Sequence, residues 1–175
     1  MLPEQDTPCL GCRDRELAFL SHEALFDYRG LPQEILQELK FSNRTGLAVW
    51  FAGLLARRIR AGYADAVVVP VPARLQRFRR YGYDGVDLLA RHLQHTHRLP
   101  VQRLLRRHRG RQQKGLGFAA RSDNLEGRIR LLRPVSRPVL LIDDVYTTGA
   151  TANECAALLA SSGAPRVRAL TLTQD

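Results

Sequence analysis

The chain has 175 residues, of which 45% are apolar and 25% are charged. These values exclude a disordered chain and suit a compact protein with a core of its own. Three cysteines, an odd number, argue against a secreted disulfide framework. Residues 1–8 contain no apolar run, and the longest apolar stretch, 47–56, is too short to span a membrane. We therefore expect a cytoplasmic protein without membrane insertion.

The positive charge is concentrated in the middle of the chain. The formal net charge is +10, but residues 74–137 hold 17 basic and 4 acidic residues, and the remainder holds 10 basic and 13 acidic residues. All basic residues except Lys40 and Lys114 are arginines, whose planar guanidinium suits phosphate. This block predicts a polyanionic ligand such as nucleic acid, pyrophosphate or a phosphorylated small molecule; a plain solvated surface is the alternative.

The first half of the chain alternates helical and strand patterns. Apolar residues at helical spacing predict helices over 32–41, 46–59 and 84–94. The β-branched run 66–71 predicts a buried strand, bounded by prolines. A short strand is expected over residues 101–105. The polar, basic stretch 106–124 has no clear periodicity and predicts a long loop, of the kind that is more often functional than idle.

The second half contains the clearest strand, residues 139–145 (VLLIDDV). A helix is predicted over 149–161 and a final strand over 165–173. Strands separated by helices imply crossover connections, and therefore an α/β fold with a mostly parallel sheet flanked by helices on both faces.

Residues 139–151 carry the main chemical pattern: a buried strand, two acids, and a Thr/Gly turn that opens a helix. Ligands of open parallel sheets bind beyond the carboxyl ends of the strands, where Asp143 and Asp144 fall. Adjacent carboxylates repel unless sugar hydroxyls or a hydrated cation bridge them. The turn 147–151 offers successive backbone N–H groups at a positive helix end, which suits phosphate. The pattern predicts a sugar-phosphate site; an ordinary strand end with a helix cap is the alternative.

This string resembles the phosphoribosyl pyrophosphate (PRPP) motif of the type I phosphoribosyltransferases, and the order of the other segments resembles the ComF/GntX family of competence-associated proteins. The resemblance covers the chain from about residue 8 onward. It implies a partial CxxC segment and hood helices over 1–62, and a phosphoribosyltransferase core over 63–175. It also implies Mg²⁺ with PRPP, and PRPP contacts from Asp143, Asp144, Val145, Tyr146, Thr147, Thr148, Gly149, Ala150 and Thr151.

Two other segments match the family. Val71, Pro72, Arg74 and Arg80 resemble its PVP strand end and its basic loop on the pyrophosphate side. The family commonly has an Asn-Gln pair after this loop, and here Asp84 and Gly85 replace it. An acid beside pyrophosphate is unfavourable unless Mg²⁺ intervenes.

The long basic loop resembles the family's mobile loop. A phosphoribosyltransferase must neutralise the leaving pyrophosphate and exclude water. The resemblance therefore implies Asp143, Asp144, Lys114, Arg109 and Arg111 as catalytic residues.

The function expected from these residues is transfer of phosphoribosyl from PRPP to an unknown acceptor, with release of pyrophosphate. The alternative is a non-catalytic accessory or sensor protein in DNA uptake or regulation. In that case the basic middle region would bind single-stranded DNA, or the chain would bind proteins of the competence machinery. Steep salt dependence of DNA binding would favour the alternative.

The remaining candidates are weaker. Cys9 and Cys12 have the spacing of a zinc knuckle, but a structural zinc site needs four ligands, so we do not expect this pair alone to hold zinc. Cys155 is expected in the core. The histidines of the HLQHTH segment, residues 92–97, are expected at a solvated helix end, and Trp50 is expected in the packing of the core or hood.

Overall fold

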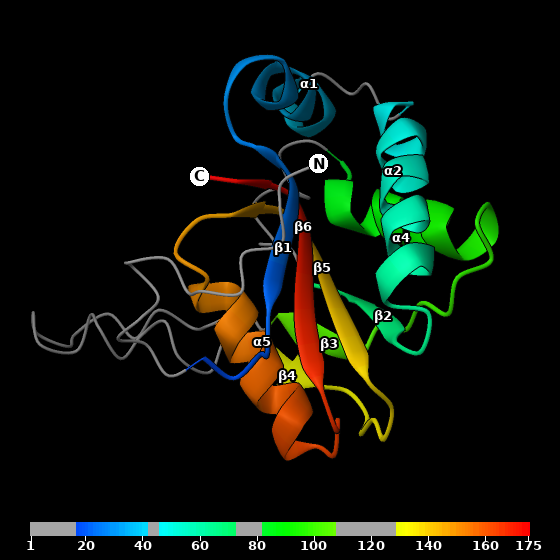
Figure 1. The fold of residues 1–175 in the computed structure, drawn as a ribbon, viewed down its shortest axis with the longest axis vertical. Coiled ribbons are helices and arrows are strands. Elements are labelled where there is room, and N and C mark those ends of the chain that lie inside the picture. The colour runs from blue at the N-terminus through cyan, green and yellow to red at the C-terminus, as the bar shows by residue number, and fades with distance from the viewer. Residues whose placement is uncertain (1–16, 42–45, 73–81, 108–128) are drawn as a thin grey trace, which may run out of the picture.

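We describe a computed structural model of the chain, in which residues 17–41, 46–72, 82–107 and 129–175 are placed well enough to describe (Figure 1). The elements follow one another along the chain as β1 (His22–Asp27), α1 (Gly30–Phe41), α2 (Leu47–Gly62), β2 (Val67–Pro70), α4 (Gly85–His95), β3 (Leu105–Arg107), β4 (Ile129–Leu131), β5 (Val139–Tyr146), α5 (Ala150–Ser161) and β6 (Val167–Gln174).

The main sheet has four strands in the order β1-β6-β5-β2, and all three pairings are parallel. Val67 is opposite Val139 at the start of β2, and Val139 is opposite Val167. The parallel register brings the carboxyl ends of the strands to one edge of the sheet. β3 and β4 form a separate antiparallel pair. The predicted α/β fold with a mostly parallel sheet is confirmed.

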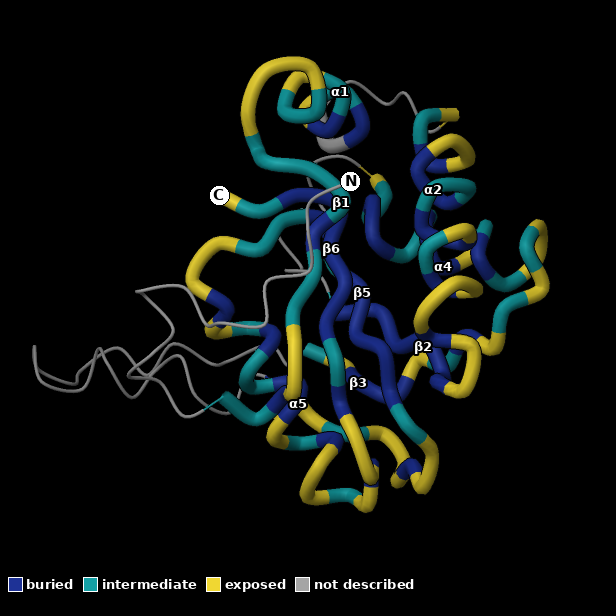
Figure 2. Tube along the Cα trace, in the orientation of Figure 1, coloured by how far each residue is buried: buried dark blue, intermediate teal, exposed yellow. Residues whose placement is uncertain are grey.

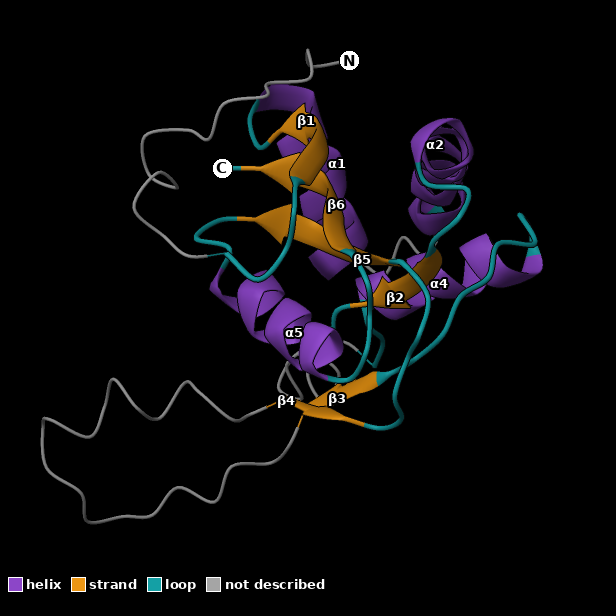
Figure 3. Ribbon diagram, turned by 60° about the horizontal axis from the view of Figure 1, so that its bottom comes forward, coloured by secondary structure: helices purple, strands orange, loops and turns teal. Residues whose placement is uncertain are grey.

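The helices cover both faces of the sheet (Figure 3). Because side chains alternate along a strand, Leu140 and Ile142 of β5 pack toward α2 and α4, whereas Val139 and Leu141 pack toward α5 and the β3–β4 pair. β2, β5 and β6 are consequently buried along most of their length, whereas β1, at one end of the strand order, is half-buried (Figure 2). Two apolar clusters, one on each face, hold the sheet in place.

Helix α1 lies beyond the carboxyl edge of the sheet, because it follows the carboxyl end of β1 (Figure 1). The hydroxyl of Tyr83 donates to the Leu39 carbonyl at 2.5 Å, which joins the end of α1 to the segment before α4. Leu36 and Leu39 are buried in the cluster that also contains α2 and α4. This packing brings the start of α4 close to the same edge.

Three local expectations differ from the structure. The strand predicted over 101–105 is reduced to one bridge between Val101 and Val68, and β3 begins only at Leu105. Neither β1 nor β4 was predicted, because His22 and Glu23 interrupt the apolar alternation of β1 and β4 has three residues. Trp50 is 50% exposed and contacts the Phe51 ring edge to face, so of its two expected places, core or hood, the core was wrong.

Among the described residues, no helix combines the length and apolar character that crossing a bilayer requires.

Candidate functional site

The carboxyl ends of β2 and β5 lie side by side. Pro70 is opposite Ile142, and the Val71 N–H donates to the Ile142 carbonyl at 3.0 Å. The PVP segment therefore ends beside the two acids of β5. Val71 is buried, and the Pro72 carbonyl accepts from Nε of Arg107 at 3.3 Å.

Asp143 and Asp144 end the buried part of β5. Asp144 is 6% exposed, and its backbone N–H donates to Oδ1 of Asp143 at 2.8 Å. The Thr173 hydroxyl, on β6, donates to the Asp144 carbonyl at 3.2 Å. The backbone around the two acids is therefore fixed from a neighbouring strand.

A third carboxylate lies at this edge. Asp84 caps α4, where Oδ1 accepts from the Val86 N–H at 3.2 Å. Burial raises the pKa of Asp84, and the negative charges of Asp144 and Asp87 raise this pKa further. Asp84, the residue that departs from the family pattern, thus lies within electrostatic reach of Asp144. Two neighbouring carboxylates offer the oxygen ligands that Mg²⁺ prefers, so the residues fit this ion.

No group of three His, Cys, Asp or Glu side chains that could hold a metal ion by itself occurs within the described ranges.

The turn after β5 has the form that the sequence predicts. Gly149 has a φ of +73°, a left-handed conformation that favours glycine, and α5 begins at the next residue. The Thr148 hydroxyl accepts from the Ala150 N–H at 3.4 Å. Thr147, Thr148 and Ala150 are exposed, so a ligand can reach the positive start of α5.

The structure places only part of the predicted site. Asp143, Asp144, Val71, Pro72 and the turn meet at one edge. The other predicted site residues lie outside the described residues: Arg74, Arg80, Arg109, Arg111, Lys114, Cys9 and Cys12. Sequence reasoning did not place Arg107 beside Pro72 or Asp84 beside Asp144, since both contacts join elements far apart in the chain.

Cys155 is a core thiol, as expected. Burial is the main reason that its pKa is raised to about 12, and the charges of Asp143 and Glu154 add to the effect. A thiol with such a pKa is protonated and inert at neutral pH.

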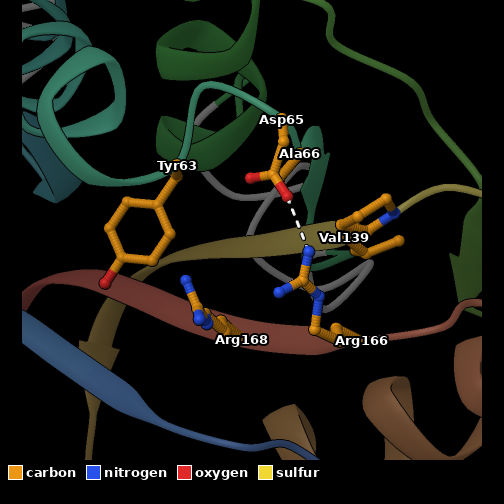
Figure 4. A pocket seen from close by; sticks show the side chains of 7 residues that line it. Tyr63, Asp65, Ala66, Val139, Arg166 and Arg168 are labelled. Atoms are coloured by element: carbon orange, nitrogen blue, oxygen red, sulfur yellow. Dashed lines mark hydrogen bonds and ion pairs between the residues drawn. The ribbon is translucent and has the colours of Figure 1, made fainter.

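The opposite edge of the sheet holds a small cavity of about 10 Å³, space for about one water molecule (Figure 4). Tyr63, Asp65, Arg166 and Arg168 line it, and Arg166 forms an ion pair with Asp65 at 2.9 Å. This cavity lies at the amino ends of β5 and β6, away from the predicted site.

The fold resembles a solved structure described as the allosteric regulatory enzyme of purine biosynthesis. The similarity has a TM-score of 0.51 at 15% identity and covers 78% of this chain but only 30% of that chain. Together with the parallel sheet and the acid-turn-helix site, it assigns the chain to the type I phosphoribosyltransferase fold. At this identity the similarity defines the fold alone.

The sequence comparisons define the family. No family model matches the chain. The DNA utilization protein YhgH of Escherichia coli O6:H1 is 31% identical over 170 residues, which cover 92% of this chain and 75% of that protein. The competence protein ComFC of Streptococcus pneumoniae is 26% identical over 99% of this chain and 78% of its own length. The chain belongs to the ComF/GntX family, with these DNA utilization and competence proteins.

Proposed function

We propose that the carboxyl edge of the sheet binds PRPP with Mg²⁺, and that the chain transfers the phosphoribosyl group to an acceptor with release of pyrophosphate. One observation carries the proposal: two acids and a left-handed turn at a helix start follow directly on one buried strand. This arrangement offers acceptors for a sugar and donors for a phosphate within one short segment.

The ribose would bind to the acids. A carboxylate accepts hydrogen bonds from two hydroxyls, and charge-assisted bonds of this kind are stronger than neutral ones. The backbone of Asp144 is held by Thr173 and by the Asp143 side chain, which limits the movement of the acceptors. We infer that Asp143 and Asp144 orient the ribose hydroxyls.

The 5′-phosphate would bind to the turn. The first N–H groups of a helix have no partner within the helix, and the helix dipole adds positive potential there. Thr147, Thr148 and Ala150 are exposed at this position, so a phosphate can reach the start of α5. We infer that Thr147, Thr148, Gly149, Ala150 and Thr151 hold the phosphate.

The pyrophosphate side would be completed by Mg²⁺. The ion would stabilise the negative charge that develops on the leaving pyrophosphate. Among the described residues, Asp84 and Asp144 would hold it, since the negative charge of Asp144 raises the pKa of Asp84 and a cation between the two carboxylates would offset this repulsion. Val71 and Pro72 border this side, and Arg74 and Arg80 stay predicted contacts.

In the reaction, the bond between the anomeric carbon and pyrophosphate breaks, and a bond from that carbon to the acceptor forms. The ribose gains oxocarbenium character between these events, so nearby carboxylates favour the transition state electrostatically. Arg109, Arg111 and Lys114 remain predicted catalytic residues that would neutralise the pyrophosphate.

Titration calorimetry tests the proposal. Mg²⁺-PRPP is titrated into the wild type and into an Asp143→Asn/Asp144→Asn variant, with Asp65→Asn at the opposite edge as the matched control. We expect binding by the wild type and the control, and at least a hundredfold loss, about 2.7 kcal/mol, in the double variant. A folded wild type that does not bind Mg²⁺-PRPP contradicts the proposal, as does equal binding by the double variant.

A second candidate function is binding of single-stranded DNA, and the exposed arginines favour it. Exposed arginines lie on α2, on α4, on the segment that follows α4 and on β3, and two of them, Arg91 and Arg103, pair with Asp87: Arg60, Arg91, Arg98, Arg103 and Arg106. Relatives are named as DNA utilization and competence proteins. Binding through such residues would weaken steeply as salt rises, whereas an affinity that does not depend on salt would exclude it.

A further inference from the structure

An aromatic stack joins β1 to Tyr146, the residue at the end of β5 that precedes the turn. The imidazole of His22, on β1, is stacked on the Tyr146 ring, with centroids 3.8 Å apart and an angle of 17° between the planes. The Phe19 ring packs edge to face against the same Tyr146 ring, with the two ring centroids 6.4 Å apart. Tyr146 is therefore held between residues that precede it by more than a hundred positions.

The His22 imidazole is itself fixed and uncharged. Its Nε2 lies 2.9 Å from the Thr171 hydroxyl, which gives its single proton to the Thr173 carbonyl at 3.0 Å. Since a hydroxyl has one proton, Nε2 of His22 must be the donor to Thr171. Burial lowers the pKa of His22 to about 4, so the ring is neutral at physiological pH. A neutral ring with one tautomer forms a rigid platform.

The Tyr146 ring reaches the left-handed residue of the turn. A β-carbon on Gly149 would overlap the Tyr146 hydroxyl, so the ring occupies the space beside this backbone position. The Tyr146 carbonyl also accepts from the Asp175 N–H at 2.9 Å. The side chain and the main chain of Tyr146 thus both restrain the turn.

The same platform extends to the acids. Thr171 and Thr173, both buried on β6, connect His22 to the Asp144 carbonyl by hydrogen bonds of 2.9, 3.0 and 3.2 Å. Thr171 and Thr173 are two residues apart on β6, so this strand connects the imidazole of His22 to the backbone of Asp144. His22 therefore contacts the turn through Tyr146 and the acids through β6.

We propose that His22 and Tyr146 are positioning residues, which hold the phosphate turn at the distance from Asp144 that a ribose 5-phosphate unit requires. This inference rests on the proposed function and extends it to a residue on β1. His22 does not touch the ligand; it acts through the Tyr146 ring.

The test compares two probes, ribose 5-phosphate and Mg²⁺-pyrophosphate, by calorimetry. In His22→Ala we expect the affinity for ribose 5-phosphate to fall roughly three- to tenfold, which corresponds to the interaction free energy of one aromatic pair. The affinity for Mg²⁺-pyrophosphate should be unchanged. His22→Phe keeps a ring against Tyr146 and should restore most of the loss. His95→Ala, at the exposed end of α4, is the matched control.

Hydrogen exchange of the amides in 147–151, measured without ligand, separates this inference from the proposed function. We expect faster exchange in His22→Ala and in Tyr146→Leu, and near wild-type exchange in His22→Phe. If the wild type does not bind PRPP, the proposed function is wrong. The hydrogen-exchange rates still show whether His22 and Tyr146 restrain the turn, because they are measured without ligand.

The positioning role is overturned if folded His22→Ala and Tyr146→Leu variants exchange these amides as slowly as the wild type. It is also overturned if His22→Ala weakens both probes equally, because that result indicates a general loss of structure. Should His22→Ala fail to fold, Tyr146→Leu and His22→Phe give the same two readouts.

Discussion

The amino and carboxyl edges of the sheet differ in how their charged side chains are arranged. At the amino edge, the Glu23 carboxylate accepts from the Arg58 guanidinium and from the Tyr63 hydroxyl, and Asp65 pairs with Arg166. Opposite charges satisfy one another there, and the cavity between them has space for about one water molecule (Figure 4). This edge is complete without a ligand.

At the carboxyl edge, like charges meet. The negative charge of Asp144 contributes to the raised pKa of Asp84, and Asp143 precedes Asp144 on β5. The exposed turn adds backbone donors at the start of α5. Ion pairs at the amino edge stabilise the fold, whereas the carboxyl edge is where we propose that the hydroxyls, the phosphate and the cation of a ligand bind.

The largest expected effect is at the carboxyl edge, in Gly149→Ala. A side chain at φ +73° costs about 1–2 kcal/mol, and overlap with the Tyr146 hydroxyl raises the loss of unfolding free energy to about 3 kcal/mol. Urea denaturation measures this loss. In a Tyr146→Leu background the same substitution should cost roughly half as much, because the left-handed backbone is still strained but the overlap is gone. An equal cost of Gly149→Ala in both backgrounds would refute the overlap.

At the amino edge, Arg58→Gln should lower the unfolding free energy by about 2 kcal/mol, because the partly buried Glu23 carboxylate loses its counter-ion. Both side chains retain some exposure, which keeps the loss below that of a fully buried pair. Mg²⁺-PRPP affinity, measured by calorimetry, should be unchanged. A variant that loses ligand affinity but not stability would reverse our assignment of the two edges.

His22 should make stability depend on pH. Burial lowers its pKa from 6.5 to about 4, against the opposing charge of Glu23, so the folded state resists a proton that the unfolded state accepts. Above pH 6.5 the imidazole is neutral in both states and does not change the unfolding free energy. As the pH falls from 6.5 toward 4, the unfolded state binds the proton first, and the unfolding free energy decreases. Between pH 7.5 and pH 4.5 we expect the wild type to lose about 2 kcal/mol more than His22→Phe in urea denaturation. Parallel pH profiles would contradict the lowered pKa.

The smallest effect is expected for Asp65→Asn. The Asp65 and Arg166 side chains are 57% and 51% exposed, so solvent screens their ion pair. The unfolding free energy should change by less than about 0.5 kcal/mol, and thermal denaturation should show a nearly unchanged Tm. A loss as large as that of Arg58→Gln would mean that the outer ion pair also supports the sheet.

Much of the fold follows from local patterns. The strand over 139–145 and the helix over 149–161 are found within a residue or so, because a β-branched run and helical periodicity are local signals. The short strands β1, β3 and β4 were missed or misplaced, since their pairing depends on partners distant in sequence. The exposure of Trp50 did not follow from the sequence, because periodicity does not show whether another element covers a helix face.

The sequence alone determined the acid-turn-helix segment, because all its groups follow one another on a single strand and helix. It also determined the parallel α/β order, since strands separated by helices require crossovers. Only the tertiary structure decided which distant residues complete the edge: Asp84 beside Asp144, Arg107 at Pro72, and His22 against Tyr146. These contacts depend on the parallel register and on packing across the sheet. They cannot be predicted from local sequence patterns, because the residues in contact are far apart in the chain.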